Sequence, residues 1–391
     1  MQTASRTHGF TESVIRGMTR LANEHGAINL SQGFPNFQPP EVMIEAVTRA
    51  LRDGVNQYAI TWGAKRLRDA LTRKYADWYG LAIDPESEIV VTCGATEAIA
   101  AVMLALVNPG DEVVVFEPFY ENYGPDAILC GARPVYVPMA PDRSLDLERL
   151  AAAFSPRTRA IIVNTPNNPT GRVLDRAELE AIADLCRRHD AWAVTDEIYE
   201  HIYYEGAHIP LATLPGMRAR TVTVSGASKT YSVTGWRVGT IVAPAEATLA
   251  IRKVHDFLTV GAPAPLQEGV AAAIETLGRD YYAGLARDYR ARRDLLCGAL
   301  SEVGFRLKPP QGAYYVMADF SALSSLPDDR FAVWLTREIG VASVPGSSFY
   351  STPELGRHLV RFAFCKTEPM LREAVGKLAA LKSARVPSGV T

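Results

Sequence analysis

A lysine and an arginine stand eight residues apart in one stretch of small and hydroxyl-bearing residues. Lys229 follows Ser228, and Arg237 ends the stretch, which comes after a β-branched segment at residues 221–224. A lysine in a loop is usually a solvated surface group, but an amine held at a strand end can serve as a nucleophile or a base. The planar arginine cation suits an anion such as phosphate. The pair is therefore a candidate for covalent chemistry beside an anion.

Two further strand-like segments end in side chains that bind ligands or hold protons. Asp196 follows the segment Trp192–Thr195, and Tyr199 comes three residues later. Asn168 follows the segment Ala160–Val163, within a run of asparagine and proline. Taken singly, the aspartate would fit a helix N-cap and the asparagine an ordinary turn. Together they offer a carboxylate, a phenol and an amide.

A small-residue turn follows a fourth strand-like segment, Glu88–Thr92. It contains Gly94, Ala95 and Thr96 and opens a predicted helix at Thr96–Val107. Backbone N–H groups left free at a helix start bind anions, most naturally phosphate. The same turn would also fit a tight connection without a ligand, so its meaning depends on the other strand ends.

Short apolar segments alternate with longer helical stretches from about residue 85 onward. This alternation predicts an α/β fold with a mainly parallel central sheet sandwiched by helices. Ligands of such sheets bind outside the carboxyl ends of the strands, so the four groups of side chains should meet at one edge. The other expected strands are Glu112–Phe116, Pro134–Val137, Thr221–Val224 and Val238–Val242.

The pattern changes in the last third of the chain. From Pro265 to about Leu300 the helical period is unbroken, which predicts one helix long enough to bridge two domains. Strands are expected at Ala313–Asp319 and His358–Phe364, on either side of a helix at Arg330–Ile339. We therefore expect a large domain at about 45–290 and a smaller α+β domain formed by the N-terminal segment 1–44 and the C-terminal residues 291–391.

Composition and charge exclude several classes of protein. The 41 basic and 43 acidic residues among 391 give a net charge of −2, which leaves no electrostatic footprint for nucleic acid. The longest apolar run, Ala98–Val107, is about half of the roughly 20 residues that cross a bilayer, and the N-terminus lacks a signal-peptide core. Five scattered cysteines form neither a disulfide framework nor a zinc motif. We expect a soluble, cytoplasmic protein with no metal site and no membrane or nucleic-acid partner.

Taken together, the four strand ends resemble those of the fold-type I pyridoxal 5′-phosphate enzymes, specifically the class I/II aminotransferases. The resemblance runs from about Asn29 to Phe364 and rests on Asn168-Pro169-Thr170-Gly171, on Asp196 with Tyr199, and on Ser228-Lys229 with Arg237. Three more motifs are similar to the kynurenine, glutamine and methionine aminotransferase branch. They are Ser31–Phe37, Asn56-Gln57-Tyr58 and Glu117–Tyr120.

The resemblance implies a role for each polar group around the cofactor. Lys229 would hold pyridoxal phosphate as a Schiff base and later move a proton at the substrate Cα. Asp196 would pair with the pyridine nitrogen, while Tyr199 and Asn168 would hydrogen-bond the 3′ oxygen of the ring. Tyr120 would stack on the ring.

The phosphate would be held by four residues, namely Ala95, Thr96, Ser228 and Arg237. One departure from the family pattern concerns this group. Many relatives carry a serine three residues before the lysine, where this chain has Gly226. Either Ser228 or Ser225 would then take over its role.

Arg361 stands in the middle of the apolar segment 358–364, where a guanidinium must find a partner or an opening. It would form either a structural salt bridge or, as the resemblance implies, a bidentate clamp on the α-carboxylate of the substrate. Gly33 and Asn168 would lie close to that carboxylate. Tyr58 would reach the cofactor phosphate of a neighbouring subunit, which predicts a homodimer with shared active sites.

The resulting prediction is an aminotransferase that exchanges an amino group between an L-amino acid and a 2-oxo acid by a ping-pong mechanism. The segment Phe257–Ala262 offers no cation, which favours neutral, aromatic, methionine or glutamine substrates. The alternative enzyme is a cysteine-S-conjugate β-lyase, because the same chemistry can expel a leaving group. A transcription regulator is disfavoured because the resemblance begins near residue 29, and a nicotinamide-binding protein because no GxGxxG follows the first strand.

Overall fold

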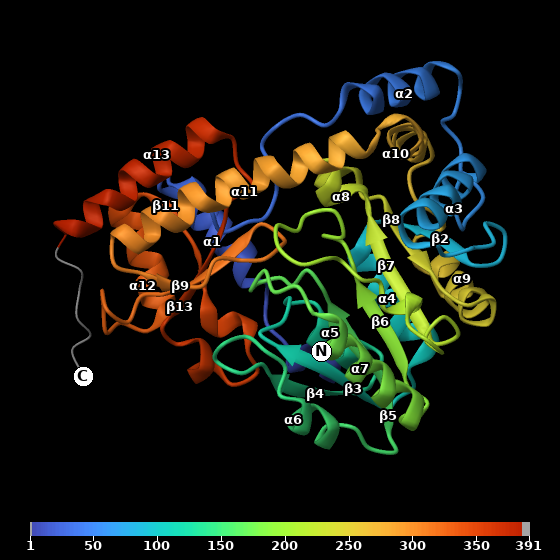
Figure 1. The fold of residues 1–391 in the computed structure, drawn as a ribbon, viewed down its shortest axis with the longest axis horizontal. Coiled ribbons are helices and arrows are strands. Elements are labelled where there is room, and N and C mark those ends of the chain that lie inside the picture. Colours follow the sequence, from blue (N-terminus) through green and yellow to red (C-terminus); the bar gives the residue numbers. More distant parts are fainter. Residues whose placement is uncertain (1, 385–391) are drawn as a thin grey trace.

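A seven-stranded sheet forms the centre of the computed structural model, which describes residues 2–384 (Figure 1). The strand order is β2-β8-β7-β6-β5-β3-β4, and all neighbours are parallel except β8, which runs antiparallel to β2 and β7. The predicted mainly parallel α/β sheet is therefore confirmed. Its strands are β2 (Ile89–Thr92), β3 (Glu112–Glu117), β4 (Arg133–Pro138), β5 (Thr158–Asn164), β6 (Trp192–Asp196), β7 (Thr221–Gly226) and β8 (Gly239–Val242).

Both faces of this sheet are apolar, because side chains that alternate along each strand meet helices on either side. On β3, Val113 and Val115 belong to one buried cluster, whereas Val114 and Phe116 belong to another. The first cluster includes α4 (Ala95–Leu106), α5 (Tyr123–Leu129) and α9 (Ala245–Thr259). The second includes α6 (Leu147–Ala152) and α7 (Arg176–His189). Further along the sheet, α2 (Glu41–Arg52), α3 (Lys65–Tyr79) and α10 (Ala264–Thr276) pack against β2 and β8.

A four-stranded antiparallel sheet of order β12-β13-β10-β9 forms the second part of the molecule. The N-terminal α1 (Val14–Glu24) and β1 (Ile28–Asn29) join this part, since β1 pairs with β11. We call it the small region, and the part built around the seven-stranded sheet the large region. The small region contains β9 (Arg306–Leu307), β10 (Tyr315–Asp319), β11 (Val341–Ala342), β12 (Val344–Pro345), β13 (Leu359–Ala363), α11 (Arg279–Glu302), α12 (Asp328–Trp334) and α13 (Glu368–Leu378).

The unbroken helix expected from Pro265 to Leu300 is wrong. The structure has two helices, α10 and α11, which are separated by Leu277 and Gly278. Gly278 lies extended at φ −75°, ψ 174° and is the N-cap of α11. Glycine is unfavourable within a helix, so the helix breaks here. Figure 1 shows α11 passing from the end of α10 along the top of the view into the small region. The bridge between the two regions is thus jointed at one glycine.

Shorter helical turns complete the described chain. The helix predicted at Arg330–Ile339 begins as α12 and ends in a π-helical turn at Leu335–Ile339. The four-residue α8 (Ala227–Thr230) follows β7 directly. The 3₁₀ turns lie at Ser5–Gly9, Leu211–Thr213, Thr234–Trp236, Gly346–Phe349, Pro353–Gly356 and Ala379–Lys382. Among residues 2–384, none of the helices combines the length and apolar character needed to span a bilayer.

Candidate active site

One cavity of about 660 Å³ opens at the carboxyl ends of β5, β6 and β7 and extends to the small region. Its volume lies within the usual range for small-molecule and cofactor sites. Eleven of the twelve site residues expected from the sequence line it, and Tyr58 is the exception. The eleven are Gly33, Ala95, Thr96, Tyr120, Asn168, Asp196, Tyr199, Ser228, Lys229, Arg237 and Arg361.

Lys229 lies on α8, one turn after the end of β7, and its amine points into this cavity. The Nζ atom donates only a long hydrogen bond, of 3.4 Å, to the carbonyl of Gly33. It lies 5.9 Å from the ring centre of Tyr199 and 5.8 Å from that of Tyr314. Burial lowers the pKa of Lys229 to about 8. A substantial fraction of this amine is therefore neutral near physiological pH, as a nucleophile or base requires.

Asp196 ends β6 and is buried, with both carboxylate oxygens engaged. Tyr123 donates its phenol proton to Oδ2 at 2.7 Å, and the Ile198 N–H donates to Oδ1 at 3.2 Å. Burial raises the pKa of Asp196, while these hydrogen bonds oppose that shift. The sequence prediction missed Tyr123, although its place three residues after Tyr120 was a usable signal.

Backbone N–H groups and a guanidinium meet where α4 begins. Gly94 precedes the helix at φ 85°, and no side chain caps the first turn. A Cβ on Gly94 would lie 2.3 Å from an Arg237 terminal nitrogen, so that side chain would have to move, and the positive φ itself favours glycine. The Arg237 guanidinium makes two long hydrogen bonds, to the carbonyls of Thr234 at 3.2 Å and Cys93 at 3.4 Å. The arrangement suits a phosphate group.

Ser228 and Ser225 differ in their surroundings. Ser228 lines the cavity, whereas Ser225 donates to the buried carboxylate of Glu200 at 2.5 Å. A Cβ at position 226 would lie 2.7 Å from the carbonyl of Val238, just before the neighbouring strand β8. The close approach of the backbone explains why glycine stands there, and the geometry favours Ser228 over Ser225 as the phosphate ligand.

Arg361 is 1% exposed on β13 and faces the cavity from the small region. One terminal nitrogen donates to Asn168 Oδ1 at 2.8 Å and the other to the Ser31 carbonyl at 2.7 Å, while Nε has no partner. The guanidinium lies 4.3 Å from the Tyr315 ring centre. Within residues 2–384 it forms no ion pair with a carboxylate, so the structural salt bridge considered for it is wrong.

Aromatic side chains enclose the space between Lys229 and Arg361. The Tyr199 hydroxyl donates to the Tyr315 hydroxyl at 3.2 Å. Tyr120 packs edge-on against Tyr123, with ring centres 5.7 Å apart. Burial raises the pKa of Tyr120 to about 12 and that of Tyr199 well above its ordinary value, so both phenols are protonated. Tyr315 was missed because its place at the start of an apolar strand carries no distinguishing pattern.

Tyr58 lies outside the cavity and is 83% exposed. Phe257, in the segment expected to line the side-chain pocket, is 92% exposed. Ile60, Leu258 and Val260 are exposed as well. The single chain therefore does not bring these residues to the site.

The observed groups fit pyridoxal phosphate. A buried carboxylate suits a protonated ring nitrogen, and the start of α4 with Arg237 suits the phosphate. Lys229 supplies an amine of lowered pKa, and the Arg361 guanidinium, whose hydrogen bonds go to neutral oxygens, suits a substrate anion. Within the described residues no cluster of histidine, cysteine or acidic side chains could hold a metal ion.

The fold and the site together define a fold-type I pyridoxal-phosphate enzyme. A family model described as "Aminotransferase class I and II" matches residues 25–378, and the chain belongs to this family. It is therefore pyridoxal-phosphate-dependent, as expected from the sequence.

Several curated proteins and solved structures are similar over nearly the whole chain. A "Probable N-succinyldiaminopimelate aminotransferase DapC" of Mycobacterium tuberculosis is 41% identical over 97% of this chain and 98% of its own length. The methionine aminotransferase of Escherichia coli is 39% identical, over 94% and 96%. The structure of the M. tuberculosis N-succinyldiaminopimelate aminotransferase superposes with a TM-score of 0.94, over 97% of this chain and 100% of that one. A human kynurenine–oxoglutarate transaminase is 36% identical, over 96% and 97%, so the expected branch is confirmed.

Proposed function

We propose that the chain exchanges an amino group between a neutral L-amino acid and a 2-oxo acid by a ping-pong mechanism. One observation carries the proposal. The Lys229 amine stands in one cavity between a buried carboxylate, Asp196, and a buried guanidinium, Arg361. The amine is suited to proton transfer at the substrate Cα, and the guanidinium to holding the α-carboxylate beside it.

Each side chain has a proposed task. Pyridoxal phosphate, when bound, supplies an electron sink for negative charge at the substrate Cα. Lys229 Nζ would take the proton from the substrate Cα and deliver it to the C4′ carbon of the cofactor, and the Asp196 carboxylate would pair with the ring nitrogen. Tyr199 and Asn168 would orient the ring, and Tyr120 would cover its face. Ala95, Thr96, Ser228 and Arg237 hold the phosphate, while Arg361, Asn168 and Gly33 bind the substrate carboxylate.

The preference for neutral side chains rests on the charges along the cavity. Arg16 and Glu121 both line the cavity, so it carries one cation and one anion on this side. Glu121 also accepts hydrogen bonds from Ser13 and Ile15 at the start of α1. The curated relatives are named for different amino acids, among them methionine, kynurenine and N-succinyldiaminopimelate, which leaves this preference a proposal.

A half-reaction screen tests the proposal. Purified enzyme is mixed with single amino acids, and conversion of the bound cofactor to its amine form is followed by absorbance. Methionine, glutamine or phenylalanine should react faster than aspartate, and Lys229→Ala should react with none. Formation of pyruvate and ammonia from cysteine conjugates, with no new amino acid, would instead indicate the β-lyase. Faster reaction with aspartate would contradict the neutral preference.

We also propose a homodimer with shared sites, in which the exposed Tyr58 and Phe257 meet a second copy. Tyr58→Phe should weaken cofactor retention about ten- to a hundredfold, because a phenol bonded to phosphate contributes about 1.5–3 kcal/mol. Hybrids of a Tyr58→Phe chain with a Lys229→Ala chain contain one site that is wild-type at both positions. Their activity at low cofactor should exceed that of either parent, and a fully active monomer in sedimentation would contradict the proposal.

Two more general expectations remain proposals. We propose a large pyridoxal-phosphate-binding domain over residues 45–290 and a small domain formed by 1–44 and 291–391. The packing of α1 and β1 with β11 supports the second assignment. We propose the cytoplasm as the location, in keeping with five free cysteine thiols.

A further inference from the structure

Arg143 joins three separate segments of main chain behind the active site. Its Nη1 donates to the carbonyls of Thr170 and Lys308, each at 3.2 Å, and its Nη2 donates to the carbonyl of Met317, also at 3.2 Å. Thr170 belongs to the large region, whereas Lys308 and Met317 belong to the small region. A single guanidinium thus connects the two regions.

The positions of two of these carbonyls are informative. Thr170 follows Asn168 by two residues in the same turn. Met317 on β10 is the register partner of Arg361 on β13. Arg143 therefore hydrogen-bonds the main chain two residues after Asn168 and the main chain of β10 at the position paired with Arg361. Arg361 in turn donates a hydrogen bond to Asn168 Oδ1 across the cavity, at 2.8 Å.

The conformation and charge of Arg143 are unfavourable by themselves. Its φ is 70°, in the left-handed region that a long side chain rarely adopts. Burial lowers the pKa of its guanidinium, and among the described residues it forms no ion pair. A cation in this setting depends on the three carbonyls for its hydrogen bonds. A partly buried cation in a left-handed backbone conformation, held only by main chain, indicates a specific task at this junction.

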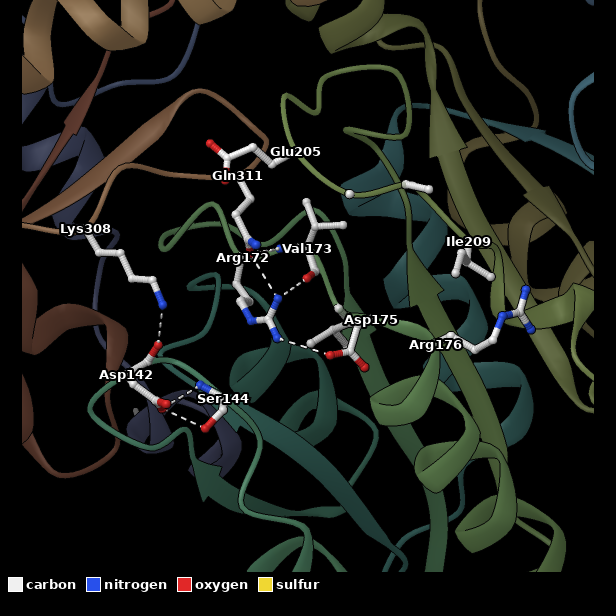
Figure 2. A pocket seen from close by; sticks show the side chains of 13 residues that line it. Asp142, Ser144, Arg172, Val173, Asp175, Arg176, Glu205, Ile209, Lys308 and Gln311 are labelled. Atoms are coloured by element: carbon white, nitrogen blue, oxygen red, sulfur yellow. Dashed lines mark hydrogen bonds and ion pairs between the residues drawn. The ribbon is translucent and has the colours of Figure 1, made fainter.

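A second cavity, of about 500 Å³, lies beside Arg143 at the same junction (Figure 2). Its walls come from the large region, around Arg172 and Asp175, and from the small region, at Lys308 and Gln311. Figure 2 shows Lys308 reaching toward Asp142, whose carbonyl accepts its amine at 3.1 Å. The two regions share apolar packing elsewhere, around Ile202 and Tyr314, but at this cavity they are joined by polar links.

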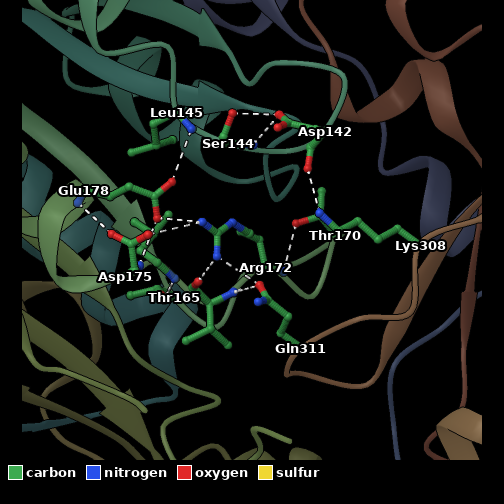
Figure 3. A network of polar contacts seen from close by, with 12 residues as sticks. Asp142, Ser144, Leu145, Thr165, Thr170, Arg172, Asp175, Glu178, Lys308 and Gln311 are labelled. Carbon is green, nitrogen blue, oxygen red and sulfur yellow. Dashed lines mark hydrogen bonds and ion pairs between the residues drawn. The ribbon is translucent and has the colours of Figure 1, made fainter. Parts of the chain in front are cut away.

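The other polar links at this junction join residues next to Thr170 with the loop before β10 and do not reach the strand itself (Figure 3). Arg172 donates to Gln311 Oε1 at 3.0 Å and to Glu178 Oε2 at 2.8 Å. The main-chain N–H groups of Gln311 and Gly312 donate to the Gly171 carbonyl at 2.9 and 2.8 Å. These bonds fix the loop that precedes β10. Arg143 alone among the side-chain links described here contacts Thr170 together with the strand opposite Arg361.

We propose that Arg143 is a positioning residue that sets the separation of Asn168 and Arg361, and thereby the geometry of the α-carboxylate subsite. The inference rests on the proposed function, in which those two side chains bind the substrate carboxylate. Arg143 itself contacts no substrate. Its loss would let the small region shift relative to the large region, and a misplacement of about 1 Å can cost about 10²-fold in rate.

The test compares a carboxylate substrate with an amine that lacks the carboxylate. Single-turnover half-reactions of the holoenzyme are measured with methionine and with 3-(methylthio)propylamine, which carries the same side chain. Arg143→Met should lower the ratio of the two rate constants about ten- to a hundredfold. Methionine would share the unfavourable φ of Arg143, so the change isolates the guanidinium. Lys308→Met, which removes only the neighbouring link to Asp142, should leave the ratio at its wild-type value.

The outcomes separate this inference from the proposed function. Arg361→Met should lower the same ratio at least as much as Arg143→Met. If Arg361→Met leaves the ratio unchanged, the proposed carboxylate site is wrong. If only Arg143→Met leaves it unchanged, or slows both substrates equally, Arg143 is merely structural and the inference is overturned. Should Arg143→Met fail to fold, Arg143→Lys keeps the cation without the planar donors and should lower the ratio severalfold, and an unchanged ratio again overturns the inference.

Discussion

The cofactor half and the carboxylate half of the active site are built in different ways. In the cofactor half, Ala95, Asp196 and Lys229 each lie at or directly after the end of a strand in one hydrogen-bonded sheet. In the carboxylate half, Arg361 comes from β13 of the small region and meets Asn168 from the large region. The first half is as rigid as the sheet, whereas the second depends on how two regions are held together. A substitution in one half should therefore change the property of that half, substrate carboxylate binding or cofactor chemistry, and leave the other unchanged.

The largest separation is expected from Arg361→Met. The change removes two charge-assisted donors and should lower kcat/KM for amino acids by about 10²–10³-fold. Cofactor retention should stay at the wild-type level, because no cofactor-binding group is altered. Stopped-flow half-reactions measure the first quantity, and absorbance after gel filtration measures the second. Loss of cofactor in this variant would show that the two halves are not separable.

A smaller effect is expected on the pH dependence of stability, because the Lys229 amine is buried in the cofactor half. In the cofactor-free protein its pKa is about 8, against 10.5 as the ordinary value. Between these values the unfolded chain binds a proton that the folded chain does not, so raising the pH stabilises the fold. From pH 8 to 9.5 the wild type should gain about 1.6 kcal/mol in unfolding free energy relative to Lys229→Met.

Urea unfolding of both cofactor-free proteins at the two pH values measures this gain. The Lys229→Met variant is the reference for the wild type, because the two proteins share every other titrating group. A constant difference between the two proteins would mean that the amine is not desolvated. The comparison would then be weakened, since the cofactor half would be open to water.

The smallest effect is expected from Tyr123→Phe. Loss of the phenol raises the pKa of Asp196 further, because its hydrogen bond favours the ionised carboxylate. One such bond contributes about 1 kcal/mol, so the half-reaction should slow about 3- to 10-fold. Methionine and its carboxylate-free amine should slow by the same factor. A selective loss for methionine would place Tyr123 in the carboxylate half instead.

The same division explains what the sequence predicts well. A strand of a parallel sheet is short, apolar and followed by its functional residue, so Asp196, Lys229 and the turn at Gly94 are visible in order along the chain. The expected strand Trp192–Thr195 and the observed β6 differ by one residue. The helix break at Gly278 was missed, because one glycine in a continuous helical pattern changes the period very little.

Contacts between segments far apart in the chain are harder to predict from the sequence. Arg361 was visible because a cation in an apolar strand is conspicuous. Arg143 and Tyr315 gave no such signal, since one lies in a polar turn and the other begins an apolar strand. Their roles depend on packing between regions far apart in the chain. Tyr58 stays a prediction, because its proposed partner is a second copy.

The joint at Gly278 has a consequence for protein engineering. A Cβ at this position would meet no neighbouring atom, and its φ of −75° is open to any residue. Substitutions there would change the backbone preference between α10 and α11 without touching the cavity. A rotation at the joint would carry α11 and the chain beyond it, including Arg361, together with α1 and β1, while Lys229 and Asp196 stayed in place. A substitution at the exposed Gly278, which lies outside the cavity, should thus change the substrate range of the enzyme.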